Sequence, residues 1–283
     1  MKQTRLKPVS EMPISFDLKD WESSDVPEDY LEQYHVDVDK ESLEHLLEGA
    51  DGRIEVDGDI VTRYMPECGG KSKVPCFLMR KWGSFYEDQY EDSSGTHGIS
   101  FEGGRLVAPD MNLFHTQTRS ASPDNEEHMM LPGYPAPNWC LEVEWEREAN
   151  QSNKGFDKVN NLFSYTGANG TQIEEIWLLV YPQGNKVLTV PEPPNHLPVI
   201  TKTQHRPVPG SKYIAIFVRD LDLTVDQYVN DAERRLLVGY YLIEPNKTFR
   251  VPACSLLNGA PDISSNQLMK AMGYKIQFQE VHK

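Results

Sequence analysis

The sequence predicts an α/β fold in which helices flank a mixed central sheet. Residues 139–145 alternate between apolar and polar side chains, which is the period-two pattern of a β-strand. From residue 154 the apolar spacing becomes helical, with Phe156 and Val159 on one packing face. The run IWLLVY at 176–181 is continuously apolar, which is typical of a central strand covered on both faces. Together these segments predict a sheet with helices packed on it.

Length and composition indicate an ordinary globular protein. A chain of 283 residues can form one good core, and its length does not require two domains. No apolar run approaches the roughly 18 residues of a membrane span, and the first residues, MKQTRLKPVSEMPISFDL, lack the apolar segment of a secretory signal. The cysteines at 68, 76, 140 and 254 include no C-x-x-C pair. We therefore expect an intracellular protein, cytoplasmic or nuclear and not secreted, without disulfides or structural zinc.

The negative charge is concentrated in one segment. The net charge is −15, which argues against a protein that grips nucleic acid over its whole surface. Residues 17–48 contain twelve Asp or Glu and two Lys, so they contribute −10 and the rest of the chain −5. The run is interpreted as a solvated, disordered or helical face, or as an acidic arm that contacts a basic partner or competes with nucleic acid. Residues 39–52 predict a short amphipathic helix, with Leu43, Leu46 and Leu47 on one side.

A hairpin follows the acidic arm. Residues 52–65, GRIEVDGDIVTRYM, predict two strands that turn at the dipeptide Asp57-Gly58. Glu55 precedes this turn, and a salt bridge to Arg53 or Arg63 is one role for it.

The next segments lead toward the central strand. CGGKSK at 68–73 is expected to be a flexible connector, and residues 74–90 have helical spacing, although Gly83 disfavours an unbroken helix. Residues 93–104 are expected to form a loop into the strand that begins at Arg105.

Three carboxylates are predicted to converge beside the strand at 139–145. Side chains alternate along a strand, so Glu142 and Glu144 share one face while the apolar set faces a core. The two glutamates therefore look into a polar surface or a cleft that could also receive Asp110. Such a set suits a hard divalent cation. The polar, proline-rich loop at 120–137 joins the strands that carry Asp110 and Glu142, and we expect it to hang over this site.

The C-terminal part is less regular. PQGN and KVLTV after residue 181 predict a hairpin with the apolar strand, and the proline-rich segment that follows ends it. KYIAIFV at 212–218 is expected to be a strand, residues 224–242 a helix running into an extended segment, and residues 266–272 a short helix. Residues 200–283 contain eleven Lys or Arg and eight Asp or Glu, a slight surplus that could face a polyanion or simply be solvated.

Five motifs follow one another along the chain: RIEVDGD at 53–59, GGRLVAPD at 103–110, PNWCLEV at 137–143, KGFDKVNNLFSY at 154–165 and EIWLLVYP at 175–182. In this order they resemble the Uma-type restriction endonuclease family of the PD-(D/E)XK nuclease-like superfamily. The resemblance covers about half the chain and implies a restriction-endonuclease-like core. The chain departs from the family pattern at Asn138 and Tyr181, where the family has Asp.

The resemblance implies a metal-dependent active site. Asp110, Glu142 and the backbone carbonyl of Val143 would hold Mg²⁺ or Mn²⁺, and Glu55 would border the site. The superfamily places its lysine two residues after the glutamate, but Glu144 stands there. The Uma-type branch carries this lysine on the following helix instead.

Two lysines on that helix are candidates for the catalytic role. Lys154 and Lys158 are four residues apart and share a face. Lys158 lies within the helix body, where its long stem can run along apolar surface to the carboxylates. Lys154 lies in the first turn, where fraying and the helix dipole disfavour a fixed ammonium. We therefore predict Lys158, with Lys154 as the reserve and a solvated helix lysine as the alternative.

Two functions remain open. The first is a Mg²⁺-dependent endonuclease, a hydrolase of DNA or, secondarily, RNA; the second is an inactive nuclease-fold protein that acts as a binding or interaction module. The partners considered are nucleic acid as substrate, a basic protein for the acidic arm and a second copy in a homodimer, with no membrane. We divide the chain into an acidic arm at 1–48, a nuclease-like domain at 49–244 and a C-terminal extension at 245–283.

Overall fold

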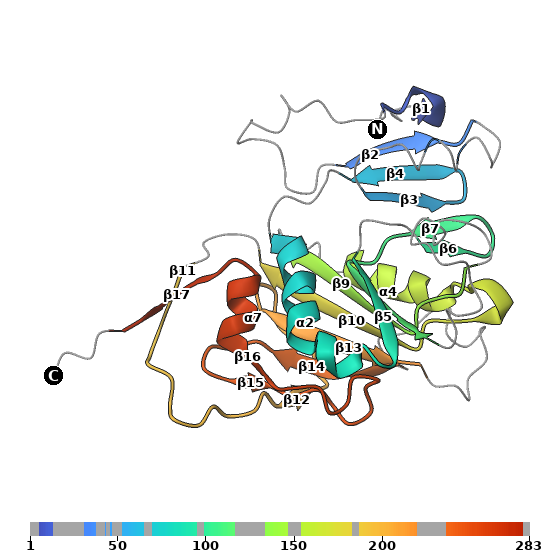
Figure 1. Cartoon of the computed structure of the whole chain (residues 1–283). Helices are drawn as coiled ribbons and strands as arrows, with labels where there is room; N and C mark the ends of the chain where they lie inside the picture. The colour runs from blue at the N-terminus through green and yellow to red at the C-terminus, as the bar shows by residue number, and fades with distance from the viewer. Residues whose placement is uncertain are drawn as a thin grey trace.

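Two larger sheets dominate the structure. The computed structural model describes residues 6–13, 31–37, 43, 46, 53–64, 70–94, 99–116, 134–146, 154–182, 187–219 and 236–279. Within these residues a seven-stranded and a six-stranded sheet are accompanied by two two-stranded ribbons. The α-helices α2, α4 and α7 pack around the larger sheet (Figure 1). The predicted α/β class, with a mixed sheet flanked by helices, is confirmed.

The seven-stranded sheet is built around a parallel pair of strands, β9 and β10. Its order is β12-β14-β13-β10-β9-β8-β5. Only β9 and β10 run parallel to each other, and the remaining neighbours are antiparallel. The strands are β5 (Tyr90–Ser94), β8 (Met111–His115), β9 (Trp139–Glu146), β10 (Glu175–Pro182), β12 (Lys202–Thr203), β13 (Tyr213–Val218) and β14 (Leu237–Leu242). The predicted central strand at 176–181 is therefore correct.

Helices cover both faces of this sheet. On one face, α2 (Gly70–Tyr86) and α7 (Ser265–Ala271) pack on the odd-numbered residues of β9, such as Leu141 and Val143. On the other face, α4 (Lys154–Ser164) packs on β10 and β13 through Phe156, Val159 and Leu162. Figure 1 shows α2 and α7 on one side of the sheet and α4 apart from them. The apolar spacing from residue 154 thus correctly predicted the helix and its packing face.

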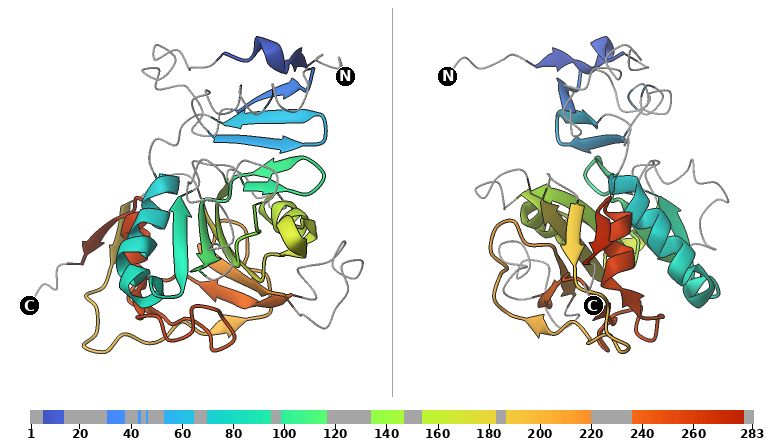
Figure 2. Two further views of the ribbon diagram at one scale, coloured as in Figure 1. Left: turned by 45° about the vertical axis from the view of Figure 1, so that its right-hand side comes forward. Right: turned by 90° about the vertical axis from the view of Figure 1, so that its left-hand side faces the viewer.

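The six-stranded sheet lies beside the larger one, and Figure 2 shows it from two further sides. Its order is β1-β2-β4-β3-β7-β6, with β1 parallel to β2 and the other neighbours antiparallel. A small core of its own contains Val9, Tyr34, Val56 and Val61. The strands are β1 (Lys7–Pro8), β2 (Leu31–His35), β3 (Arg53–Asp57), β4 (Ile60–Tyr64), β6 (Ile99–Phe101) and β7 (Arg105–Val107), and the 3-10 helix η1 spans Val9–Glu11.

The acidic arm is more structured than the expected solvated or helical face. β2 pairs with β4, and Val9, Met12 and Tyr34 are buried. Among the described residues of the charged run 17–48, β2 pairs with β4 and Tyr34 packs in the core of the six-stranded sheet. Within the predicted helix at 39–52, Leu43 and Leu46 are helical, and Leu47 lies outside the described residues.

Several local predictions for the first half were wrong. The hairpin predicted at 52–65 is confirmed, but it turns at residues 58–59 and not at Asp57-Gly58, because Asp57 pairs with Ile60 and Gly58 adopts φ +59° as the first loop residue. Residues 70–73 of the expected connector form the first turn of α2, which continues unbroken through Gly83. The expected loop at 93–104 contains β6, which forms a hairpin with β7.

The C-terminal residues belong to the main body. β11 (Val187–Val190) does not form the predicted hairpin with β10; it pairs in parallel with β17 (Lys275–Phe278). β15 (Thr248–Phe249) pairs with β16 (Ile263–Ser264), which leads into α7. The helical half of the prediction at 224–242 falls on 224–235, outside the described residues, whereas the extended half and the short helix near 266–272 are confirmed.

Glu175 ties the C-terminal segment to the central sheet. Its side chain is fully buried at the start of β10 and accepts hydrogen bonds from Ser255 Oγ at 2.6 Å and from the Leu256 backbone N–H at 2.6 Å. The indole N–H of Trp177 donates to the same carboxylate. Burial raises the pKa of Glu175 above its ordinary value of 4.5, and these hydrogen bonds oppose the rise.

None of the helices in the described residues is long and apolar enough to cross a membrane.

Gly167 lets two segments approach closely near the start of β9. A Cβ added at Gly167 would lie 2.3 Å from the backbone nitrogen of Ala136, so the backbone would have to move. We expect Gly167→Ala to lower the free energy of unfolding by about 2 to 3 kcal/mol, measured by urea denaturation. Gly83→Ala is the matched control, because no atom lies within 4 Å of its added Cβ. It should raise stability by about 0.5 to 1 kcal/mol; equal effects of the two changes would contradict this packing.

The raised pKa of Glu175 predicts a pH dependence of stability. A carboxyl whose pKa is raised in the fold favours the protonated form, so its contribution to stability falls as the pH rises above 4.5. Glu175→Gln removes this titration. The stability of the variant relative to the wild type should therefore improve as the pH rises from 4.5, measured by denaturation at several pH values, with Glu87→Gln at an exposed position as background. A relative stability that worsens with rising pH would refute the prediction.

Candidate active site

β9 carries Glu142 into a buried layer between the sheet and α4. Cys140 contributes to the apolar cluster on the α4 side, so Glu142, two residues later, points to the same side. The Glu142 side chain is only 1% exposed. Of the two predicted surroundings, a polar surface or a cleft that also receives Asp110, the polar surface is wrong for Glu142, because both faces of β9 are covered. Glu144, next on this face, is half-buried.

Asp110 lies across from Glu142 at the end of the β8–β9 ladder. The last register pair is Met111 with Leu141, and one step further places Asp110 opposite Glu142. Residues at opposed positions of antiparallel strands project to the same side of the sheet. Asp110 is 4% exposed, and its Oδ2 accepts a hydrogen bond of 2.6 Å from the backbone N–H of Val143. The sequence-predicted pair of carboxylates is thus brought together.

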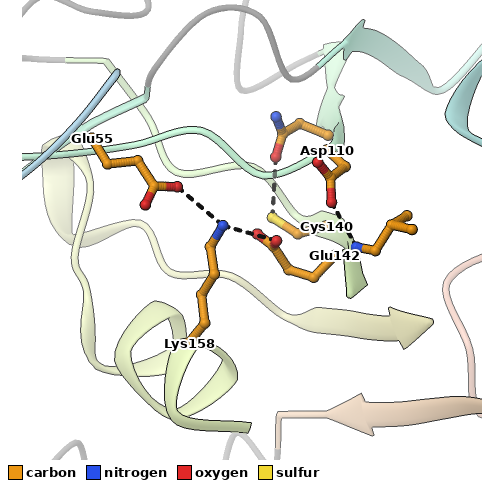
Figure 3. Close-up of polar contacts among 7 residues, drawn as sticks. Glu55, Asp110, Cys140, Glu142 and Lys158 are labelled. Carbon is orange, nitrogen blue, oxygen red and sulfur yellow. Dashed lines mark hydrogen bonds and ion pairs between the residues drawn. The ribbon is translucent and has the colours of Figure 1, made fainter. Parts of the chain in front are cut away.

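Lys158 reaches Glu142 from the middle of α4. Its Nζ lies 2.8 Å from Glu142 Oε2 and 3.0 Å from Glu55 Oε1 (Figure 3). The Lys158 and Glu55 side chains are 18% and 16% exposed, so this ion pair is largely shielded from water. We call Glu55, Lys158 and Glu142 the lysine clamp. Lys154 begins α4, and its side chain lies outside the described residues.

Glu55 was predicted at the border of the site, and the structure gives it an ion pair that sequence reasoning missed. Arg53 and Arg63 were the expected partners, whereas Lys158 is 103 residues away in the sequence. No short sequence pattern predicts a contact over this sequence separation. Arg63 is itself buried and donates a hydrogen bond to the backbone carbonyl of Pro13.

Gly155 allows the first turn of α4 to approach β9 and β10. A Cβ at this position would lie 2.9 Å from Leu178 Cδ1 and 3.0 Å from Glu144 Cγ. Lys158 follows three residues later, so the close packing at Gly155 sets the height of the ammonium above the sheet. Phe156 and Val159, both buried, fix the rotation of the helix.

Cys140 lies beside the clamp as a neutral thiol. Burial raises its pKa well above the ordinary value of 9.0, the charge on Glu142 raises it further, and Lys158 opposes the rise. Its Sγ donates to Asn112 Oδ1 at 3.2 Å, and both residues are fully buried. A buried neutral thiol is a poor nucleophile, so Cys140 has a packing role. Asn112 was missed by sequence analysis, because a single Asn in an apolar strand carries no specific signal.

The donor set fits a hard divalent cation in part. Mg²⁺ is commonly held by one or two carboxylates while water and substrate oxygens complete its shell, and Asp110 and Glu142 supply two such groups. The N–H of Val143 points to Asp110, beyond the last β8–β9 register pair. Because the carbonyl of a strand residue points to the same side as its N–H, the Val143 carbonyl also points toward Asp110. In the described residues, no group of three or more His, Cys, Asp or Glu side chains could hold a metal. Two carboxylates and one carbonyl are thus what this corner offers.

Comparison with known proteins finds a distant structural likeness. No family model and no curated protein matches the sequence. A crystal structure of a candidate nuclease belonging to DUF820 from Anabaena variabilis ATCC 29413 superposes with a TM-score of 0.42 and 13% sequence identity. The similar region covers 77% of this chain and 90% of the other.

The lysine clamp predicts a stability effect that can be measured without any substrate. Lys158→Met leaves Glu142 buried without its ammonium partner and should lower the free energy of unfolding by about 2 to 4 kcal/mol at neutral pH. The deficit should shrink in acid, where the carboxylates take up protons. Urea denaturation at both pH values tests this. Lys270→Met at an exposed position of α7 is the control, and equal losses in the two variants would exclude a supporting role for the clamp.

Proposed function

We propose that this protein is a Mg²⁺- or Mn²⁺-dependent nuclease of the PD-(D/E)XK type, related to the Uma-type restriction endonucleases, which cleaves phosphodiester bonds in DNA or, secondarily, RNA. One observation carries the proposal: the ammonium of Lys158 lies 2.8 Å from Glu142, and Asp110 accepts a hydrogen bond from the backbone N–H of Val143, the residue after Glu142. Two carboxylates and a lysine at one point of a sheet supply the functional groups that metal-assisted phosphodiester hydrolysis requires.

Asp110, Glu142 and the Val143 carbonyl are the groups that would hold the cation. Carboxylate and carbonyl oxygens are hard ligands, which suit Mg²⁺ and Mn²⁺. When bound, the cation would lower the pKa of a water molecule and neutralise charge on the scissile phosphate. The hydrogen bond from the Val143 N–H fixes one oxygen of Asp110 and leaves the orientation of the carboxylate defined before any ligand arrives.

Lys158 would supply the positive charge that the reaction needs. An ammonium can orient a water molecule and stabilise negative charge that develops on the phosphate. Glu55 and Glu142 hold Nζ from two sides, so its position is set in advance at little further entropic cost. Glu55 also keeps a partner for the ammonium when Glu142 turns toward another ligand. Glu144 is the additional carboxylate of this face, and Lys154 is the reserve for the lysine role.

Metal-stimulated cleavage tests the proposal directly. The wild type should cleave plasmid DNA or a labelled oligonucleotide with millimolar Mg²⁺ or Mn²⁺, and Asp110→Asn and Glu142→Gln should each reduce the rate by at least about 100-fold. Circular dichroism verifies that the variants are folded. Lys158→Met should be similarly impaired, and Lys154→Met on the same helix is its matched control.

The outcomes separate the residue assignments. Cleavage that survives Lys158→Met and fails with Lys154→Met would move the catalytic role to Lys154. Cleavage that survives both carboxylate changes would remove the site from this corner of the protein.

The lysine clamp also supports a second function, in which its ion pairs are purely structural. Lys158 already neutralises two carboxylates, and the chain carries a net charge of −15, which opposes phosphate binding. A catalytically inactive nuclease-fold protein that binds a basic partner through its acidic arm would have these properties. Calorimetric titration distinguishes the two: no binding of Mg²⁺ or Mn²⁺ at millimolar concentration favours the binding module.

A further inference from the structure

An exposed guanidinium lies on β7 of the six-stranded sheet, close to the lysine clamp. Arg105 begins β7, and its side chain is 42% exposed. Its Nε donates to Asp57 Oδ1 at 3.2 Å, and its Cζ lies 4.8 Å from the centre of the Tyr165 ring. Arg105 is thus held by a carboxylate at one edge and by an aromatic face beneath it, while much of the side chain meets water.

The sheet register places this arginine next to the clamp. Val56 pairs with Leu106, so Arg105 lies opposite Asp57. Asp57 and Glu55 are two residues apart on β3 and project to the same face. Their separation along the strand is about 7 Å. Glu55 belongs to the clamp, so a polymer chain bound at Lys158 would pass within reach of Arg105.

Tyr165 is the common neighbour of these charged groups. Burial raises the pKa of its hydroxyl, the charges on Asp57 and Glu55 add to the rise, and Arg105 and Lys158 oppose it. The ring also packs on Phe101, with centroids 5.3 Å apart, so it is anchored on its other side. Tyr165 therefore forms a fixed platform that joins the end of α4 to β7.

The free edge of the guanidinium is suited to a phosphate. Among the described residues, the hydrogen bond of the Arg105 side chain uses Nε, and the two Nη groups make none. Arginine binds phosphate through two parallel N–H donors, which the Nη pair can supply. The exposed contact with Asp57, whose side chain is 66% exposed, is worth little by itself. It orients the guanidinium without burying it.

We propose that Arg105, positioned by Asp57 and Tyr165, binds a backbone phosphate of the nucleic-acid substrate next to the phosphate that is cleaved. This inference rests on the proposed nuclease function and adds a substrate contact to it. The net charge of −15 opposes phosphate binding. The guanidinium of Arg105 would offset this repulsion locally, next to the carboxylates Asp110 and Glu142.

Binding of a short fluorescent oligonucleotide, followed by anisotropy at several salt concentrations, tests the inference in the full-length protein. Arg105→Ala should weaken binding by about 10-fold and reduce the magnitude of the slope of log affinity against log salt by about one, the change expected for the loss of one phosphate contact. Arg105→Lys should recover part of the affinity, because the charge stays and the two-pronged geometry is lost. Arg250→Ala is the matched control, since Arg250 is also exposed and paired with a carboxylate, Asp262.

Tyr165 is tested as a positioning residue. Tyr165→Phe keeps the ring beneath the guanidinium and should bind the oligonucleotide like the wild type. Tyr165→Leu should weaken binding, and its slope of log affinity against log salt should equal that of Arg105→Ala. Rescue by the aromatic variant separates positioning from a role of the hydroxyl.

Two results would overturn the inference in different ways. If the wild type cleaves DNA with metal and Arg105→Ala binds and cleaves equally well, the inference fails and the proposed function stands. If the wild type neither binds the oligonucleotide nor cleaves it, the inference and the proposed function fail together.

Discussion

The ion pair of Lys158 with Glu142 and Glu55 joins three parts of the molecule that are far apart in sequence. Glu142 belongs to the middle of the seven-stranded sheet, Glu55 to the six-stranded sheet, and Lys158 to the helix that covers the larger one. Two largely buried carboxylates would be costly without a cation, and the ammonium offsets that cost at one point. This ion pair therefore contributes both to the contact between the two sheets and to the polarity of the site.

The periodic elements of the sequence could be predicted, and the contacts between them could not. The strand at 139–146, the helix from 154 and the apolar strand at 176–181 follow from spacing alone, because packing against a core enforces one period for each element. Lys158 could also be predicted in preference to Lys154. Lys158 lies in the helix body, at the border of the apolar stripe, where its long side chain can reach the carboxylates and its backbone is ordered, whereas Lys154 lies in the first turn. Asp110 was assigned from the resemblance to the nuclease-like superfamily, and it directly precedes β8, whose neighbour β9 carries Glu142.

What escaped prediction depends on pairing across long sequence distances. β11 pairs with β17 instead of folding back on β10, although a turn-forming segment follows β10 directly. The charged run at 17–48 was interpreted as a solvated, disordered or helical face, but its described residues 31–35 form a strand that buries Tyr34. Glu142 was expected at a polar surface or in a cleft with Asp110, and the sequence did not distinguish the two, since a glutamate in a strand normally faces solvent. The buried Glu142 is stabilised here by Lys158, which lies 16 residues later on α4 and pairs with its carboxylate.

β9 and β10 are the parallel pair of their sheet, and α4 is the connection between them. Crossovers between parallel strands are right-handed with few exceptions, so the direction of the two strands dictates on which side of the sheet α4 must lie. That side is the one to which Cys140 and Glu142 point. A single residue inserted into β9 before Glu142 would invert the alternation and turn the carboxylate toward α2, away from Lys158. The chirality of the polypeptide thus limits how this chain can evolve: loops around the site can change in length, but the phase of β9 relative to its helix cannot.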